Sequence, residues 1–346
     1  MTAPVERTDA LSTTDAWFLH HGLTYFVPEQ RSHVRQALRA RRVVPAVLLV
    51  VIVATGAGGL TAWFADQLAL GPATLVTLLL LGGVGYALVA LHAAPIVTWA
   101  LSRTFGSLRT LLPMTTRALP LLLLFITFLF INTEVWQVAS NLSVGALLLT
   151  VVLFVVLALA FLLVRLPEEV DRVDDDVTDE LLLRACAGTP LERASRELVE
   201  AEGADPAAHA EVTGFERWNL VIVLAVIQLV QVLLVTVSVF AFLMVFGSLT
   251  MTTPVMDAWL TSPTHSVPHV SSISVALLQV SIFLSAFSGL YLTVNTVTDE
   301  TYRDQFFGNV MREMERAVAM RAVYLSLRAD PAPADPAPAD PSQAAR

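Results

Sequence analysis

Arginine is confined to alternate segments of this chain, and this pattern constrains the fold more than any other feature. Six apolar stretches reach the length that an α-helix needs to cross a bilayer, and they cover 43–64, 72–93, 118–138, 143–164, 220–247 and 273–297. All 21 positively charged residues are arginines, and all lie in segments that the alternation of spans places on one side. The only charged residues on the opposite side are Asp66, Glu134 and Asp257. Because arginine near the end of a span stays in the cytoplasm, the sequence predicts six spans with both termini inside.

The composition agrees with a membrane protein of a bacterium. Hydrophobic residues make up 55% of the chain and charged residues only 15%, whereas about a quarter of the residues of a soluble domain are charged. The absence of lysine beside abundant Ala, Leu, Val and Arg is typical of a genome rich in G and C, which favours a bacterial plasma membrane. Residues 1–42 precede the first span, so we expect that span to stay as a signal anchor.

The expected fold is an all-α polytopic membrane protein in which four transmembrane helices and then two are separated by a small cytoplasmic insert. Short links predict hairpins between spans one and two and between spans three and four, and spans five and six form a third hairpin around the longer loop 248–272. The expected segments are a cytoplasmic N-terminal segment with an interfacial helix (1–42), four spans (43–164), an acidic helical insert (165–217), two spans (218–297), a cytoplasmic amphipathic helix (298–328) and a disordered Ala/Asp/Pro tail (329–346).

The end of the N-terminal segment is typical of a helix that lies at a membrane surface. Aromatic residues precede Arg31, Arg35 and Arg39, whose spacing of four places them on one face of a helix. Aromatic and basic residues at the edge of a span contact headgroups and phosphates. The segment therefore predicts an interfacial anchor or, as the more specific alternative, a lipid-headgroup site.

Part of the same N-terminal segment resembles a known group of proteins. The stretch Trp17–Pro28, WFLHHGLTYFVP, followed by spaced arginines, resembles the N-terminal segment of uncharacterised integral membrane proteins of high-GC Gram-positive bacteria. The resemblance covers only this part of the chain. It implies a membrane location in such a bacterium and implies no activity, because none is established for that group.

The insert 165–217 is acidic and contains signals for short helices. Eight of the thirteen residues in 168–180 are acidic, but Asp179 stands where a calcium loop starting at Asp174 needs glycine, so we expect a solvated acidic run. Thr189, Pro190 and Glu192 predict the start of a helix with a capping box. The insert is too small to be stable alone, so we expect it to contact the spans or a partner. Its single cysteine, Cys186, is expected to be a small apolar residue on a helix.

Three groups of polar residues lie within or beside the predicted spans. Asn132, Glu134 and Gln137 end span three, and we expect Glu134 to be an interfacial carboxylate or, alternatively, a gating group. Gln228 and Gln231 lie three residues apart near the middle of span five. Amides at that depth bond across helices or line a substrate path.

The third group lies along span six. Serines recur there at spacings that place small residues on one face, where helices pack closely or a polar wall forms. The group comprises Ser274, Ser281, Ser285, Ser288 and Asn295, with Gln279 nearby.

The segment 298–328 predicts a long amphipathic helix. Its apolar residues recur every three or four positions and form one stripe, made of Phe307, Met311, Met314, Val318, Ala322 and Leu325. Acids and arginines balance over this segment, whereas a helix drawn to anionic lipid is basic. We therefore expect it to dock on the protein's own loops or on a second copy, and it is the candidate partner-binding helix.

The sequence favours a non-enzymatic function. The chain lacks the excess of basic residues that binding to nucleic acid requires. It also contains no catalytic or cofactor-binding motif. His265, His269 and Asp257 supply too few ligands to predict a metal site. We expect an accessory or scaffold protein that presents cytoplasmic helices to a protein partner or to a second copy. The alternative is a channel or transporter for an ion or small solute that uses the polar residues of spans three, five and six.

Overall fold

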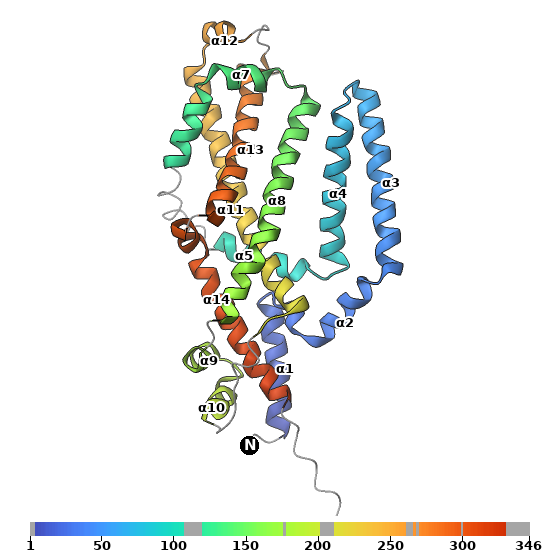
Figure 1. The fold of residues 1–346 in the computed structure, drawn as a ribbon, viewed down its shortest axis with the longest axis vertical. Coiled ribbons are helices and arrows are strands. Elements are labelled where there is room, and N and C mark those ends of the chain that lie inside the picture. Colours follow the sequence, from blue (N-terminus) through green and yellow to red (C-terminus); the bar gives the residue numbers. More distant parts are fainter. Residues whose placement is uncertain are drawn as a thin grey trace, which may run out of the picture.

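Figure 1 shows the computed structural model of the chain, which is helical except for one short hairpin in the parts it describes. Those parts are 4–106, 120–175, 178–200, 211–260, 266–267, 270–298 and 300–329. Long helices stand side by side in the upper part of the view, and shorter helices gather at its lower end.

Within the described residues, five helices are long and apolar enough to cross a membrane. They are α3 (Ala40–Ala65), α4 (Leu70–Val89), α8 (Val144–Asp175), α11 (Gly214–Thr250) and α13 (Val275–Thr298). A sixth span results if the bent pair of Pro120–Phe130 and α7 (Thr133–Ser140) counts as one. The prediction of an all-helical fold is therefore confirmed, with five or six helices able to span a membrane.

The third predicted span differs from a straight helix over 118–138. The helix that ends at Phe130 turns by 76° before α7 begins, and α7 lies across the upper end of the long helices (Figure 1). Asn132 is the cause, because its side chain accepts the N–H groups of Glu134 and Val135 and so starts a new helix. The indole of Trp136 donates to the Phe130 carbonyl, at 2.6 Å, and fixes the corner.

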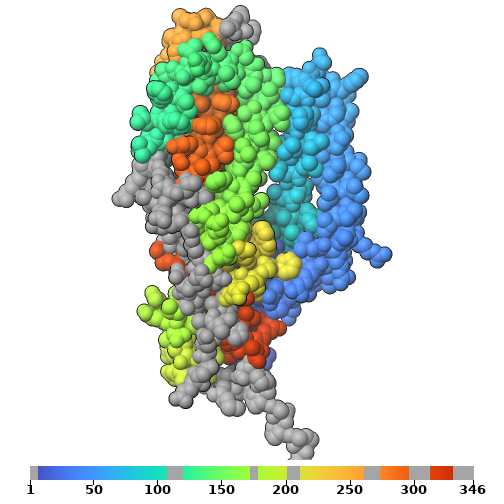
Figure 2. All heavy atoms as spheres, in the orientation of Figure 1, coloured from blue at the N-terminus to red at the C-terminus, as the bar shows by residue number. Residues whose placement is uncertain are grey.

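The hairpin of α3 and α4 forms one edge of the molecule (Figure 2). Its helices meet through small residues: a Cβ added to Gly58 would lie 2.7 Å from the Gly71 carbonyl oxygen. Most of the remaining apolar side chains of α3 are exposed, as expected for a surface that faces lipid. The hairpin contacts the start of α8, where the Gln67 side chain accepts the Gly145 N–H at 3.1 Å.

Several helices extend beyond the expected boundaries. α8 continues to Asp175 instead of ending at 164, and α11 begins at Gly214 instead of 220. The insert contributes α9 (Asp179–Cys186) and α10 (Glu192–Glu200). α10 begins two residues later than the predicted first position, Pro190, although Glu192 still accepts the Gly188 N–H at 2.8 Å.

One large apolar cluster joins segments from the whole length of the chain at the lower end of Figure 1. It contains residues of α1 (Pro4–His20), the 3-10 turn η1 (Thr24–Phe26), α9, α10, α14 (Glu300–Ala329) and the adjacent ends of α8 and α11. We call this assembly the basal module. It is connected to the long helices through α2 (Pro28–Ala37) and α5 (Ala94–Gly106), which contact η1 and α11.

A second apolar cluster holds the opposite end together. Phe130 and Trp136 pack there with residues of α11, α13 and α12 (Thr253–Trp259). Strands β1 (Ser266–Val267) and β2 (Val270–Ser274) pair antiparallel, and β2 leads directly into α13.

Candidate functional sites between the long helices and in the basal module

The three polar residues at the end of span three lie on or beside α7, away from the spaces between the long helices. Glu134 is exposed, and Asn132 is occupied as the helix cap. Gln137 donates to the Trp259 carbonyl at 3.1 Å, so it ties α7 to the loop after α12. Glu134 therefore has the surroundings of a surface carboxylate.

The two glutamines of α11 are buried between helices. Gln228 is 1% exposed and Gln231 is 6% exposed. Among the described residues, neither Oε1 atom has a hydrogen-bond partner. An unpaired amide oxygen in an apolar interior costs free energy, so a solute or a water would be stabilised by donating a hydrogen bond to either oxygen.

The serines of α13 mostly bond to their own helix. Ser285 donates to the Ile282 carbonyl, and Ser288 donates to the Ser285 carbonyl. Ser281 is fully buried, and its hydroxyl has no partner among the described residues. On the same helix, a Cβ added to Gly289 would lie 2.5 Å from the Thr236 hydroxyl, so α11 and α13 approach closely here.

The other polar residues of α13 lie elsewhere. Gln279 donates to the Leu142 carbonyl at 2.9 Å, on the side of the α7–α8 link. Ser274 accepts the Leu277 N–H and so caps the start of α13, and Asn295 is half-buried. Of the residues in the predicted polar groups, three therefore have an unpaired polar atom in the interior: Gln228, Gln231 and Ser281.

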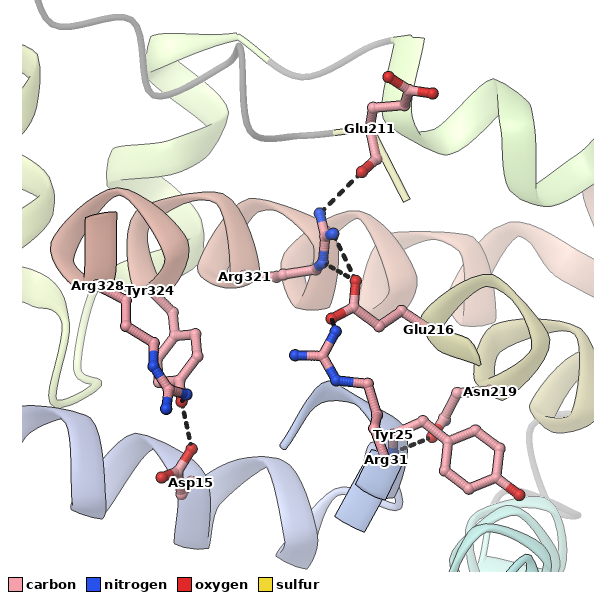
Figure 3. A network of polar contacts seen from close by, with 9 residues as sticks. All are labelled: Asp15, Tyr25, Arg31, Glu211, Glu216, Asn219, Arg321, Tyr324 and Arg328. Carbon is pink, nitrogen blue, oxygen red and sulfur yellow. Dashed lines mark hydrogen bonds and ion pairs between the residues drawn. The ribbon is translucent and has the colours of Figure 1, made fainter. Parts of the chain in front are cut away.

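A buried ionic junction in the basal module was not predicted from the sequence. Glu216, in the first turn of α11, places its carboxylate between Arg31 and Arg321 (Figure 3). One oxygen accepts from Arg31 at 2.6 Å, and the other accepts from Arg321 at 2.5 Å. The side chains of Glu216 and Arg321 are 3% and 8% exposed. Arg321 also donates to the Glu211 carbonyl at 3.0 Å.

Asn219 joins the N-terminal segment to α11 beside this junction. Its side chain accepts the Tyr25 N–H at 2.9 Å and donates to the Gly22 carbonyl at 3.0 Å. Gly22 has a φ of 70°, and a Cβ there would lie 2.9 Å from the Cβ of Trp99, so this turn requires glycine. Burial raises the pKa of Tyr25 to about 12, and its hydroxyl donates to the Leu91 carbonyl.

α1 and α14 are joined by a second polar contact. The Tyr324 hydroxyl donates to Asp15 at 2.8 Å and accepts from Arg328 at 2.9 Å (Figure 3). Burial and the neighbouring Asp15 carboxylate raise the pKa of Tyr324 to about 12. The first and last described helices of the chain are thus bonded to each other.

The candidate partner-binding helix packs on its own chain. Met314 and Val318 are buried in the basal module, and Leu325 packs against the same cluster. The side chains of Phe307 and Met311 lie outside the described residues. Docking on the protein's own segments was one of the two expectations for this stripe, and partner binding by α14 stays a prediction.

A small cavity of about 110 Å³ lies between α1, α5, α11 and α14. Trp17, Trp99 and Leu220 supply apolar walls, and Glu313 and Arg316 supply charged groups. The Arg316 guanidinium lies 5.8 Å from the centre of a Trp17 ring, and Glu313 forms an ion pair with Arg103 of α5. A cavity of this size has room for a few waters or a small apolar group.

The single cysteine lies in the core of the basal module. Cys186 is fully buried at the end of α9. Burial raises the pKa of its thiol to about 11, although a hydrogen bond with Ser195 and the charge of Arg316 lower it. Within the described part of the chain, no three His, Cys, Asp or Glu residues are placed to hold a metal ion, and His265 and His269 lie outside it.

The sequence contains one signal that locates the junction. Glu216 and Asn219 are three apart and continue the helical spacing of Leu220 and Val223, which are apolar and buried. Polar residues on the apolar face of a helix need partners when they are buried. The predicted start of span five at 220 left both residues outside the span and hid this pattern.

Comparison with known proteins adds no relative: no family model, no curated protein and no solved structure matches this chain.

Proposed function

We propose that this chain is a multi-pass protein of a bacterial plasma membrane, with both termini in the cytoplasm, and that it acts as a non-enzymatic accessory or scaffold protein. The observation that carries the proposal is the basal module. Three arginine-rich segments that are far apart in the sequence meet there around one buried carboxylate, Glu216. Buried ion pairs add little net stability but favour one arrangement of their partners. A module of fixed shape suits the presentation of a binding surface.

The surface that the module presents lies on the insert. A groove of about 540 Å³ runs between α9 and α10, where Leu183 and Val199 supply apolar walls. Glu180, Arg184 and Arg196 line the same groove with charges of both signs. Protein–protein contacts combine apolar and charged side chains, and we propose that the partner-binding surface lies here.

Site-specific photo-crosslinking in living cells tests this proposal. A photoreactive residue at Leu183 or Val199 is expected to give a discrete protein adduct of constant mass. The same residue at Leu153, which is exposed on the apolar surface of α8, serves as the control and is expected to give lipid adducts. Protein adducts absent from both groove positions, in a folded and membrane-inserted protein, would contradict a scaffold function for this surface.

A second function, transport of an ion or small solute, is supported by a separate observation. The unpaired oxygens of Gln228, Gln231 and Ser281 lie between the long helices, where polar groups mark ion and substrate paths. If transport occurs, Gln228→Leu is expected to abolish flux in proteoliposomes. Ser238→Ala, at an exposed residue of the same helix, is the control. No flux of any ion or solute with the unaltered protein would remove this alternative.

A further inference from the structure

An arginine-lined groove lies on α2, immediately before the first long apolar helix. Arg31, Arg35 and Arg39 line it at intervals of four residues, together with Pro28, Ser32 and Gln36. The groove has a volume of about 480 Å³ and is open to the surface. Guanidinium groups, a hydroxyl and an amide therefore converge on one side of this short segment.

Two of these arginines are held in place by neighbouring residues at the start of α11. Glu216 is buried and bonds one nitrogen of Arg31, whose side chain remains 24% exposed, so other N–H groups of Arg31 are available to the groove. The guanidinium of Arg35 lies 5.9 Å from the centre of the Phe215 ring. A binding group whose position is fixed before the ligand arrives loses less entropy on binding.

The groove has a positive excess that the described structure does not neutralise. Among the described residues, Arg35, Arg39, Arg41 and Arg42 form no ion pair. α2 carries one acid, the exposed Glu29. The charge around the groove therefore favours an anionic ligand.

The start of α3 adds to this positive field. The N-cap of α3 is Arg39, which makes no side-chain capping bond, and Arg41 and Arg42 occupy the first turn. A helix N-terminus carries a partial positive charge and favours anions, so three arginines there are unfavourable without a counter-charge. An anion in the groove would supply it.

We propose that this groove binds the phosphate of an anionic phospholipid headgroup. The groove borders the exposed apolar surface of α3, which begins with Val44, Val47 and Leu48. Acyl chains attached to a bound phosphate can lie along that surface, which a free phosphate cannot use. One arginine guanidinium can donate two parallel hydrogen bonds to a phosphate group. We therefore expect lipids whose headgroups carry more phosphate charge to bind more tightly.

The inference rests on α3 spanning a bilayer, as proposed above, and the test separates the two. The full chain is reconstituted in nanodiscs of zwitterionic lipid with a small fraction of anionic phospholipid, and the retained anionic lipid is measured by native mass spectrometry. Failure to insert into nanodiscs would contradict the membrane placement. A protein that inserts but retains no anionic lipid above its share in the disc would overturn the headgroup site.

Paired variants identify the groove as the binding site. Arg35→Gln with Arg39→Gln is expected to lower retention of the anionic lipid about 30-fold, from the usual effect of two arginines at a membrane surface. Arg193→Gln with Arg312→Gln removes the same charge from exposed positions on α10 and α14 and is expected to leave retention unchanged. Equal losses in both pairs would show a general charge effect and overturn the proposal.

Inorganic phosphate distinguishes the two sources of the anion. Millimolar inorganic phosphate is expected to leave the retained lipid in place, because it lacks the contacts of the acyl chains with α3. If inorganic phosphate displaces the lipid completely, the groove is a site for the free anion and the lipid proposal is wrong. Arg31 is left unaltered in these variants, because it also belongs to the buried junction.

Discussion

The carboxylate of Glu216 bonds one arginine from near the start of the chain and one from near its end. Each oxygen serves a different guanidinium, and the site is almost closed to solvent. In such a place two cations without an anion are unfavourable, because neither is fully hydrated. Arg31, Glu216 and Arg321 therefore act as one unit, and the loss of the central charge affects both contacts at once.

The first prediction concerns this carboxylate. Glu216→Gln keeps the shape of the side chain but removes its charge, and we expect it to lower the free energy of unfolding by about 3–5 kcal/mol. The measurement is thermal or chemical unfolding of the detergent-solubilised protein. Glu180→Gln, which removes an acid from an exposed pair with Arg184, is the control and should change little. Similar losses in the two variants would argue against a special role for Glu216.

The second prediction concerns Cys186. Its pKa near 11, compared with an ordinary 9.0, leaves about 100-fold less thiolate at pH 8, and burial restricts access further. We expect iodoacetamide to alkylate the native protein at least 100-fold more slowly than the unfolded chain. Because the chain has one cysteine, the rate is measured without ambiguity by intact mass. Rapid alkylation of the native protein would mean that the core of the basal module is open.

At the residue scale, the sequence predicts the surroundings of some side chains and misses those of others. The buried state of Cys186 agrees with its expected role as a small apolar residue. Glu216 and Asn219 were missed because a polar residue just outside a predicted span is ordinarily exposed. Their burial depends on α1, η1 and α14, and contacts between segments so far apart in sequence are not visible in local patterns.

At the scale of elements, hydropathy locates the long helices well and their ends poorly. Apolar runs place α3, α4, α8, α11 and α13 within a few residues of their centres, because lipid exposure requires uninterrupted apolar surface. The bend before α7 was missed because averaging over a window hides one capping residue, Asn132. The extension of α8 to Asp175 was missed because charged turns can continue a helix outside the membrane.

The α3–α4 hairpin gives a prediction with a matched control. Gly58→Ala places a Cβ 2.7 Å from the Gly71 carbonyl oxygen, where backbone cannot move aside easily. We expect this variant to lose about 1–3 kcal/mol of stability. Gly59→Ala meets no atom within 4 Å and gains helix propensity, so it should be neutral or slightly stabilising. Thermal unfolding in detergent compares the two, and an equal or larger loss at Gly59 would contradict the packing of the hairpin.

At the scale of the whole molecule, both terminal segments and the insert form one body. Figure 1 shows α1, α9, α10 and α14 together at one end, away from α7 and α12 at the other. The arginine pattern predicted that these segments share a side of the membrane. It did not predict that they pack together, because that depends on the apolar stripe of α14 meeting α9 and α1.

The most direct measurement is a cross-link between the two ends of the chain in native membranes. Asp15→Cys and Tyr324→Cys, in a Cys186→Ala background, place two thiols where the structure has a 2.8 Å hydrogen bond. Asp15→Cys with Ala258→Cys, an exposed residue of α12 at the opposite end of the molecule, is the control pair, because position 258 lies in the same fragment as position 324. After treatment with a short bismaleimide, the chain is cut at a protease site inserted within 201–210. We expect the two fragments to remain linked only in the Asp15–Tyr324 pair; their separation, with both thiols individually reactive, would contradict the basal module.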